Sequence, residues 1–395
     1  MRKVFFPIVI VLILFEIANV YFIMPMPGSQ RWNVVGFAHF LNAWKWPIRM
    51  VLYLLTIMSV MPTFRRYKIL TSICLLVVAA VTYFFNFPMT ASNMFRPIKV
   101  KKFASVKDNK ILPEKLVIGV TYGNESRAYP IEMIGYHHRV LDTISGKSVF
   151  VTYCTVCRTG RVFEPVVNGK QEEFQLVGMD HFNAMFEDKT TGTWWRQENG
   201  EACAGRLKGQ KLPEFPSVQM TLREWLQLHP DGKVLQWDSN FTDKYKRMSK
   251  FDKGNSGSKL TGSDTGSWKE KSWVLGIQGK NKAYVYDWNK LKKSRWIVDT
   301  LDGKTLLIFM HKDNMSYSAY FVKESIGQFK NSYYFEGNEH VEAKDGILYF
   351  STGKVASVNP AMVLQYQAEN APVYQEFWHS WRTFHPSSIR RFVKE

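Results

Sequence analysis

The stretch VIGVTYGNESRAYPIEMIGYHHRVLDTISGK, residues 117–147, recurs in altered form as VLGIQGKNKAYVYDWNKLKKSRWIVDTLDGK at residues 274–304. The residues that match at an offset of 157 are Gly119 with Gly276, Asp142 with Asp299, and Gly146 with Gly303. An Ala-Tyr pair matches at an offset of 155, and a later Trp…His-Pro ending matches at 156. Because the offset stays nearly constant along the chain, the sequence predicts two copies of one unit.

Short apolar runs in both copies are typical of β-strands. Lys115–Thr121, Ser148–Tyr153 and Thr305–Met310 are rich in β-branched and aromatic residues and are bounded by Gly, Asn, Asp or Ser. The clearest helix is Thr221–His229, which starts with a Thr cap and has a Glu three residues later. We therefore expect a mainly-β (α+β) domain with two pseudo-symmetric repeats, since a solenoid needs at least three copies.

Several features of the repeat have a structural interpretation. The Asp-Thr-x-x-Gly segments at Asp142 and Asp299 predict hairpin turns in which Gly supplies a positive φ. The Trp…His-Pro endings predict helix ends, so His229 and His385 are expected to be structural. The predicted organisation is a membrane unit at 1–95, a first β-rich repeat at 96–237, a polar linker at 238–270 and a second β-rich repeat at 271–395.

Three apolar stretches near the N-terminus predict transmembrane helices at 4–24, 48–64 and 69–87. The first has 21 residues and one charge, long enough for a bilayer core of about 30 Å. It has no small-x-small cleavage site, so we interpret it as an uncleaved anchor rather than a signal peptide. A buried core helix is the alternative for this stretch. The middle helix is shorter and contains Pro62 near its end.

The side of the membrane follows from the positive loops. Basic residues at positions 2–3 and 65–68 would be cytoplasmic if all three helices span, which places the chain after residue 88 outside the cytoplasm. Arg31, Lys45 and Arg49 would then lie on the outer side and oppose this orientation. With only two spans, the C-terminal domain would be cytoplasmic.

The net charge of +18 divides into +7 for residues 1–95 and +11 for the other 300 residues. Several charges of the first part mark membrane topology, and the rest are spread along the chain. We therefore expect the lipid bilayer as a partner and no nucleic acid, because no recognition motif accompanies the charge. GxSxG, HExxH, Walker and dinucleotide-binding motifs are absent from the sequence.

The motif whose side chains can react or bind a metal is Cys154-Thr-Val-Cys157, which only the first copy contains. Two residues between cysteines allow both sulfurs to reach one point, as a disulfide, as a redox pair or as two ligands of one metal. Oxidising surroundings outside the cytoplasm favour a disulfide or a redox pair. The sequence leaves these alternatives, and an inert pair, open.

A metal site would need ligands beyond the two thiolates. His137 precedes the strand that leads to Cys154, and His311 lies 157 residues after Cys154, at the equivalent place in the second copy. We hypothesise that Cys154, Cys157, His137 and His311 converge. A thiolate–imidazole set would favour zinc or copper. Cys74 lies inside a predicted membrane helix, and Cys203 is isolated in sequence.

A second cluster, Trp194-Trp195-x-Gln197, is also absent from the second copy. An aromatic pair with an amide can line a pocket, although tryptophans also fill the cores of β-sandwiches. Asp180 and Glu201, with the nearby His181, are acid–base candidates. Whether the protein is an enzyme stays open at this stage.

Together these motifs resemble the bacterial family called domain of unknown function 3179, from about Leu112 to Phe392. The resemblance lies in the following segments: Arg127-Ala-Tyr-Pro130, His137 to Asp142, Val151 to Cys157, Thr193 to Gly205 and Trp381 to Pro386. The family usually has Cys-Pro-Leu-Cys, where this chain has Thr155 and Val156. It also usually has His-Glu followed by Asn-Asp, where this chain has His137-His138 and Leu141-Asp142. The resemblance implies no activity.

We therefore predict a protein of the bacterial inner membrane with an extracytoplasmic β-rich domain. Its expected site is a metal-binding or thiol-redox centre at Cys154, Cys157 and His137, lined by Trp194, Trp195 and Gln197. The alternative is a non-catalytic structural or interaction module whose CxxC motif forms a closed disulfide. The protein partner and the cofactor, with zinc and copper as options, are not identified by the sequence.

Overall fold

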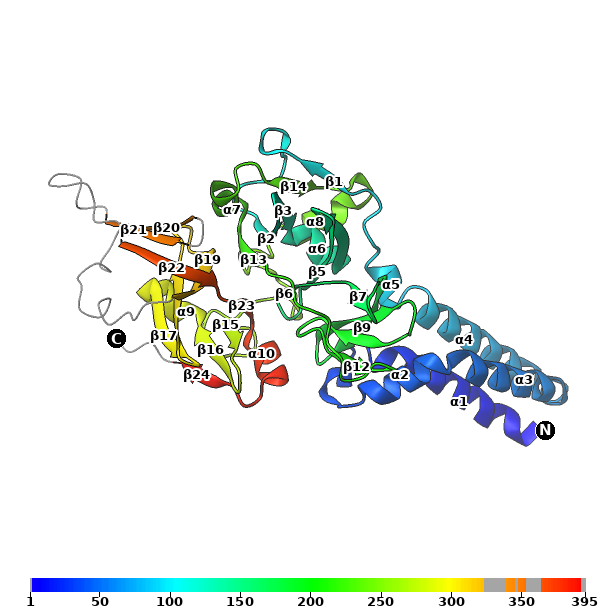
Figure 1. Cartoon of the computed structure of the whole chain (residues 1–395). Helices are drawn as coiled ribbons and strands as arrows, with labels where there is room; N and C mark the ends of the chain where they lie inside the picture. Colours follow the sequence, from blue (N-terminus) through cyan, green and yellow to red (C-terminus); the bar gives the residue numbers. More distant parts are fainter. Residues whose placement is uncertain (1, 323–338, 345–346, 353–363, 392–395) are drawn as a thin grey trace. The chain divides into compact units, whose positions relative to one another are not determined.

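The computed structural model describes residues 2–322, 339–344, 347–352 and 364–391 of the chain. Long helices at the N-terminus precede a region that is mainly β, in the order that Figure 1 shows. This confirms the predicted combination of apolar helices and a mainly-β domain.

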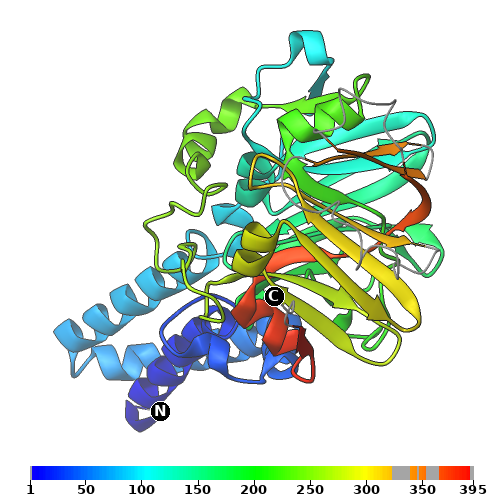
Figure 2. The ribbon, with the colours of Figure 1, turned by 90° about the vertical axis from the view of Figure 1, so that its left-hand side faces the viewer.

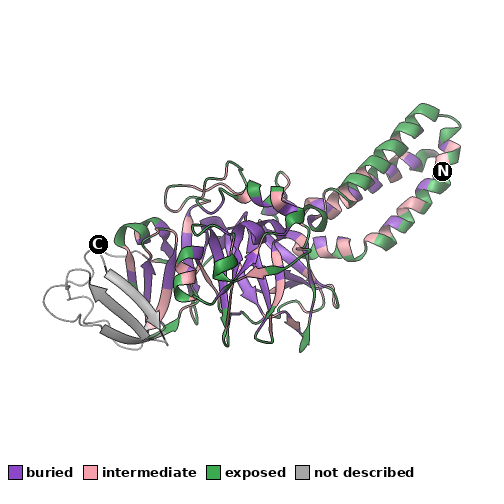
Figure 3. Cartoon of the chain, turned by 90° about the horizontal axis from the view of Figure 1, so that it is seen from above, coloured by how far each residue is buried: buried purple, intermediate pink, exposed green. Residues whose placement is uncertain are grey.

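The three long N-terminal helices lie where the apolar stretches predicted them. Each is long and apolar enough to cross a membrane, the middle one included. Figures 1 and 2 show them packed side by side, and Figure 3 shows that much of their surface is exposed. The long helices and the short elements that accompany them are α1 (Arg2–Tyr21), η1 (Ser29–Arg31), α2 (Val35–Ala43), α3 (Lys45–Phe64), α4 (Lys68–Asn86) and α5 (Ala91–Met94).

A buried polar cluster joins the three long helices. Glu16 of α1 accepts hydrogen bonds from Nε and Nη2 of Arg49 on α3, at 2.7 and 2.6 Å. Asn86 of α4 donates to Glu16 through Nδ2 at 2.9 Å. Glu16 and Arg49 are 1% and 5% exposed, so each buried charge has its counter-charge within the bundle. This pairing explains how α1 accommodates an acid among apolar residues.

The chain forms two compact units, and neither follows the sequence in one piece. The first contains residues 1–100, 133–215 and 238–244. The second contains residues 101–132, 216–237 and 245–395.

The first unit holds the three long apolar helices and three small sheets. One sheet is β4-β5-β6, and a longer one is β12-β11-β10-β9, all with antiparallel neighbours. Their strands, with those of the two-stranded sheet, are β4 (Arg139–Ile144), β5 (Lys147–Cys154), β6 (Thr159–Phe163), β7 (Val166–Val167), β8 (Lys170–Gln171), β9 (Phe174–Asp180), β10 (Asn183–Asp188), β11 (Trp194–Arg196) and β12 (Ala202–Ala204). Helix α6 (Ile131–His137) leads into β4, with its last five residues in this unit.

Two sheets of the second unit have the same strand order, apart from the additional strand β1 at the edge of the first. The first runs β1-β14-β3-β2-β13 and the second runs β24-β16-β15-β23. In both, the central hairpin is antiparallel, one flanking strand pairs antiparallel and the other pairs parallel. These strands are β1 (Lys102–Ala104), β2 (Leu116–Tyr122), β3 (Glu125–Pro130), β13 (Val218–Thr221), β14 (Lys233–Gln236), β15 (Trp273–Gln278), β16 (Ala283–Asp287), β23 (Tyr374–Phe377) and β24 (Ile389–Arg391).

The remaining sheet of the second unit is larger than its counterpart β4-β5-β6. Its order is β17-β18-β19-β22-β21-β20. The two halves of the chain therefore correspond in part of their topology and differ here. Its strands are β17 (Trp296–Leu301), β18 (Lys304–Met310), β19 (Tyr317–Val322), β20 (Glu339–Lys344), β21 (Ile347–Thr352) and β22 (Leu364–Asn370).

Short helices complete the fold. The Thr cap predicted for the helix at 221–229 is present, because the Thr221 hydroxyl accepts a hydrogen bond from the Glu224 N–H. The predicted linker at 238–270 contains both η3 and α8, so it is not loop throughout. These elements are η2 (Val106–Asp108), α7 (Leu222–Leu228), η3 (Ser239–Phe241), α8 (Thr242–Met248), α9 (Trp288–Ser294) and α10 (Trp378–Phe384).

Close packing explains why the recurring Gly and Trp positions match. A Cβ atom added to Gly119 would lie 2.1 Å from Nε1 of Trp225, and one added to Gly276 would lie 2.1 Å from Cζ3 of Trp381. Each tryptophan thus packs directly against a strand backbone. The predicted hairpin turns are also present, with positive φ at Gly146 (78°) and Gly303 (79°).

Candidate functional site

The CxxC motif lies in the hairpin between β5 and β6. Cys154 is the last residue of β5 and pairs with Thr159 at the start of β6. Cys157 lies in the intervening turn, next to Arg158, which has a φ of 57°. Both cysteines are fully buried, and both are free thiols. The hairpin therefore places two thiols together inside the first unit rather than on its surface.

The two thiols share one acceptor. The Sγ atoms of Cys154 and Cys157 lie 3.4 and 3.2 Å from the carbonyl oxygen of Phe182, to which both donate. Phe182 belongs to the turn between β9 and β10. A carbonyl oxygen with two lone pairs can satisfy both buried S–H groups.

The surroundings of Cys154 favour its ionised form. Burial raises the pKa of this thiol. Once Cys154 is ionised, the Cys157 thiol and the N–H groups of Cys157, Ala184 and Val156 donate to it, which lowers its pKa further than burial raises it. The net direction is a pKa below the ordinary value. A lowered pKa favours the thiolate, which is the nucleophilic form of a cysteine.

The turn that supplies the shared carbonyl is strained. Its two central residues, His181 and Phe182, have φ values of 49° and 69°. Tight hairpins need positive φ at both positions, which Gly, Asn or Asp adopt more easily than His or Phe. Each such residue costs on the order of 1 kcal/mol, so the surroundings must hold the turn in place.

The segment that follows α1 holds this turn. The N–H of Phe182 donates to Oε1 of Gln30 at 3.0 Å, and the Gln30 amide nitrogen donates to the Phe22 carbonyl at 3.1 Å. The N–H of Met179 donates to the Ile23 carbonyl at 2.7 Å. The chain that follows α1 therefore contacts the β9–β10 hairpin, whose Phe182 carbonyl accepts from both thiols.

Gln197, one of the predicted pocket residues, braces the CxxC hairpin. Its side-chain nitrogen donates to Oγ1 of Thr152 at 3.1 Å and to the Thr159 carbonyl at 2.9 Å. Its oxygen accepts from Nδ2 of Asn183 at 3.1 Å. Gln197 is fully buried, so it fixes β5 and β6 relative to the β9–β10 hairpin.

The predicted tryptophans lie in the core rather than around an opening. Trp194 and Trp195 are 0% and 2% exposed and belong to the same hydrophobic cluster as both cysteines. The indole N–H of Trp194 donates to Glu187 at 2.8 Å, and that of Trp195 donates to Asp188 at 2.9 Å. Both tryptophans therefore pack in the core, and each indole N–H has a hydrogen-bond acceptor.

The two adjacent histidines of the first unit are buried. Nδ1 of His137 lies 2.5 Å from the Arg96 carbonyl, and Nδ1 of His138 lies 2.7 Å from the Tyr153 carbonyl, so each Nδ1 carries the proton. Burial lowers the pKa of His137, and it lowers the pKa of His138 to about 4. Both rings are therefore neutral at pH 7. His138, which the sequence offers with His137 as a candidate ligand, contacts the backbone of Tyr153, the residue next to Cys154.

His311, the fourth predicted ligand, belongs to the second unit. Its Nδ1 lies 2.8 Å from a Glu224 carboxylate oxygen and its Nε2 lies 2.8 Å from the Ser318 hydroxyl. Both ring nitrogens thus have partners within that unit. Among the residues that the structure describes, no group of three or more His, Cys, Asp and Glu side chains is arranged to hold a metal ion.

The acid–base candidates form an ion-pair network. Asp180 lies 2.6 Å from Nδ1 of His181 and 2.7 Å from Nε of Arg196, and Arg196 also contacts Glu201 at 3.0 Å. Burial raises the pKa of Asp180, but these partners lower it more, and the net direction is downward. Asp180 is therefore a stable carboxylate. Burial raises the pKa of nearby Cys203 to about 12, which leaves that thiol unreactive.

The residues that sequence reasoning missed act through backbone atoms or from a distant segment. Phe182 contributes only its carbonyl and N–H, and Gln30 lies 152 residues away in sequence. Asn183 follows the turn and bonds both Gln197 and the Glu198 N–H. The one available signal was the position of Asn183 after a His-Phe turn between two strands.

Comparison with known proteins identifies the family of this chain. A family model described as "Protein of unknown function (DUF3179)" matches residues 95–388. No curated protein and no solved structure matches the chain significantly. The matched residues include the CxxC hairpin and the β9–β10 hairpin that covers it.

Proposed function

The chain belongs to the DUF3179 family, whose description assigns no activity, and from the site itself we propose that it is a membrane-anchored thiol–disulfide redox protein. Cys154 and Cys157 are the proposed redox pair, and their proposed location is the extracytoplasmic side of a bacterial inner membrane. The observation that carries the proposal is the shared environment of the two thiols: a common acceptor at Phe182 and a lowered pKa of Cys154.

The proposed reaction is thiol–disulfide exchange with a disulfide of a protein or a small molecule. The Cys154 thiolate attacks one sulfur of the substrate disulfide, forms a mixed disulfide and releases the other sulfur as a thiolate, which takes up a proton. The Cys157 thiol then loses its proton and attacks Sγ of Cys154, which releases the second substrate thiol. The substrate disulfide gains two electrons and two protons, and the CxxC pair becomes a disulfide. The reverse sequence oxidises a substrate dithiol.

Burial of both sulfurs means that exchange requires a local opening. The turn at His181 and Phe182 is the proposed moving part, because its backbone is strained and the Phe182 N–H depends on the Gln30 side chain as its acceptor. Opening this turn would remove the shared acceptor and expose the thiols together.

The proposed location rests on the three helices. Their polar cluster joins Glu16, Arg49 and Asn86. Glu16 lies near the C-terminal end of α1, Arg49 near the N-terminal end of α3, and Asn86 at the C-terminal end of α4. This arrangement supports three antiparallel spans. The basic residues at positions 2–3 and 65–68 then lie at the opposite end, and their preference for the cytoplasm supports an extracytoplasmic domain.

We also propose that residues 96–237 and 271–395 descend from one duplicated unit. The common order of β13-β2-β3-β14 and β23-β15-β16-β24, with a tryptophan packed on a glycine in each, supports this interpretation. The CxxC motif is then a feature that one copy alone uses.

Thiol counting in defined redox buffers tests the proposal. Full-length protein in detergent is equilibrated with glutathione at graded potentials, quenched in acid and labelled with a maleimide of known mass. The expected result is a reversible two-thiol change that disappears in Cys154→Ser and in Cys157→Ser and persists in the matched control Cys203→Ser. A small-molecule disulfide should give a trapped mixed disulfide with Cys157→Ser but not with Cys154→Ser.

Two outcomes would replace the proposal by an alternative. A pair that stays oxidised in every buffer until the protein unfolds would identify a closed structural disulfide. One equivalent of zinc or copper bound by the reduced protein, and lost in both cysteine variants and in His137→Ala, would identify a metal site.

A further inference from the structure

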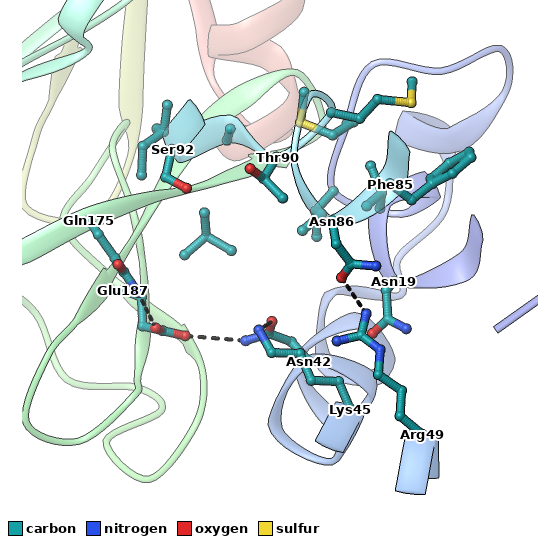
Figure 4. A pocket seen from close by; sticks show the side chains of 17 residues that line it. Asn19, Asn42, Lys45, Arg49, Phe85, Asn86, Thr90, Ser92, Gln175 and Glu187 are labelled. Carbon is teal, nitrogen blue, oxygen red and sulfur yellow. Dashed lines mark hydrogen bonds between the residues drawn. The ribbon is translucent and has the colours of Figure 1, made fainter. Parts of the chain in front are cut away.

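A pocket of about 140 Å³ lies where the ends of the three long helices meet strands β9 and β10. All of its walls belong to the first compact unit, and Figure 4 shows the side chains that line it. It is separate from the CxxC hairpin, whose residues do not line it. Its position at the ends of predicted spans makes it a pocket at the level of the membrane surface.

Two cations supply hydrogen-bond donors to this pocket. Arg49 is only 5% exposed, and its Nε and Nη2 atoms bond Glu16 and Asn86. Its Nη1 has no hydrogen-bond partner among the described residues, and Figure 4 shows the guanidinium at the pocket wall. Lys45 makes one hydrogen bond, from Nζ to the Asn42 side chain at 3.0 Å, which leaves further N–H donors.

The acid of the pocket does not cancel these donors. Glu187 is the one acid among the described lining residues. Its carboxylate already accepts hydrogen bonds from Gln175 at 2.6 Å, Asn42 at 3.3 Å and Trp194 at 2.8 Å. Its charge is therefore stabilised by the protein itself. Arg49 and Lys45 therefore keep N–H donors for a hydrogen-bond acceptor. Glu16 already balances the charge of Arg49, so Lys45 supplies the attraction for a negatively charged acceptor.

Other parts of the wall indicate an amphiphilic ligand. Val20, Phe85 and Met89 contribute apolar surface from the helix ends. The side-chain oxygen of Asn19 is buried without a hydrogen-bond partner among the described residues, so it can accept from a donor on the ligand. A phospholipid whose headgroup carries a hydroxyl or amino group has all three features that match this wall. It has an anionic hydrogen-bond acceptor, a hydrogen-bond donor and apolar chains.

We propose that this pocket binds the phosphate of an anionic phospholipid headgroup. Nη1 of Arg49 and Nζ of Lys45 donate to the phosphate oxygens, and Asn19 accepts from a headgroup hydroxyl. The acyl chains continue along the apolar helix ends. The inference rests on the membrane insertion proposed above and is independent of the chemistry of the thiols.

Lipid binding to delipidated full-length protein tests this site. The probes are a phosphatidylglycerol, a diacylglycerol with the same chains, and inorganic phosphate, each measured by native mass spectrometry from a neutral detergent. One phosphatidylglycerol should bind, and Lys45→Gln should weaken it about tenfold, as expected for loss of a charge-assisted hydrogen bond. The matched control Arg31→Gln, an exposed cation of the same unit, should bind like the wild type.

The outcomes separate the sources of phosphate and the two proposals. Competition by inorganic phosphate, with the same sensitivity to Lys45→Gln, would support phosphate recognition with the free ion as ligand. Equal binding of diacylglycerol and phosphatidylglycerol, or wild-type binding by Lys45→Gln, would overturn the proposal. Arg49→Gln is a second variant, interpreted only if its melting temperature is retained. The redox titration of Lys45→Gln should stay unchanged, so failure of one proposal does not imply failure of the other.

Discussion

The side chain of Gln30 accepts a hydrogen bond from the N–H of Phe182 at 3.0 Å, and the carbonyl of the same Phe182 accepts from both thiols of the CxxC motif. One strained residue thus connects the segment after α1 with the proposed redox pair. Both contacts lie within the first compact unit. Changes in the segment after α1 are therefore expected to alter access to the thiols.

Gln30→Ala should raise the alkylation rate of Cys154 about fivefold, because loss of one hydrogen bond of about 1 kcal/mol increases the population of the open turn by that factor. The rate is measured on the reduced protein with iodoacetamide, followed by peptide mass spectrometry. Gln171→Ala, a change at an exposed glutamine of β8, should leave the rate unchanged. An unaltered rate in Gln30→Ala would show that another element controls access.

The elements of this site were predictable to different degrees. Strand β5, the CxxC spacing and the apolar helices each come from one continuous stretch of the chain, so the sequence predicted them directly. The contact with Phe182 was not predictable, because a His-Phe turn lacks the Gly or Asn that normally indicates a tight hairpin. Gln30 was not predictable either, because an amide that bonds backbone atoms leaves no spacing pattern.

For Trp194 and Trp195, the sequence pattern identified the residues but could not decide their role. Aromatic pairs have one sequence pattern whether they line a cavity or fill a core, and burial alone decides between these roles. The structure places both in the core and gives each indole N–H a carboxylate acceptor. For His137 and His311, the residue types suit a metal, but backbone and side-chain partners account for the contacts observed.

His138→Asn should reduce the loss of stability at acid pH. Burial lowers the pKa of His138 to about 4, below the ordinary value of about 6.5, so the unfolded chain binds the proton more tightly than the folded protein. Stability is therefore fully present above pH 6.5 and falls by roughly 3 kcal/mol as the pH drops toward 4. Asn tolerates the φ of 59° at this position and can donate to the Tyr153 carbonyl in place of Nδ1.

The measurement is urea unfolding of wild type and His138→Asn between pH 4 and 8. The difference between the two proteins should shrink or change sign as the pH falls. His385→Asn, at the end of α10, is the matched control for replacing a histidine by asparagine elsewhere in the chain. Parallel curves for wild type and His138→Asn would contradict the assigned role of this ring.

Gly119→Ala and Gly276→Ala should each destabilise the protein by about 1–3 kcal/mol, because the added Cβ would overlap the ring of Trp225 or Trp381. The control is Gly257→Ala, where no atom lies within 4 Å of the added Cβ. Thermal unfolding of the four proteins checks the expectation. Similar losses at the two sites would support equivalent packing in the two halves, whereas a loss at only one site would limit the correspondence to strand order.

Glu16→Ala should destabilise the helical bundle by roughly 3–5 kcal/mol, because it leaves the Arg49 guanidinium buried without its counter-charge. The double variant Glu16→Leu with Arg49→Leu removes both charges and should be more stable than Glu16→Ala. Unfolding in mixed detergent micelles, followed by tryptophan fluorescence and far-ultraviolet circular dichroism, measures the difference. If Glu16→Ala is as stable as the wild-type protein, the Arg49 guanidinium contacts water or a lipid phosphate in place of Glu16. Repeating the unfolding with added phosphatidylglycerol separates these two, because only a bound phosphate would restore stability.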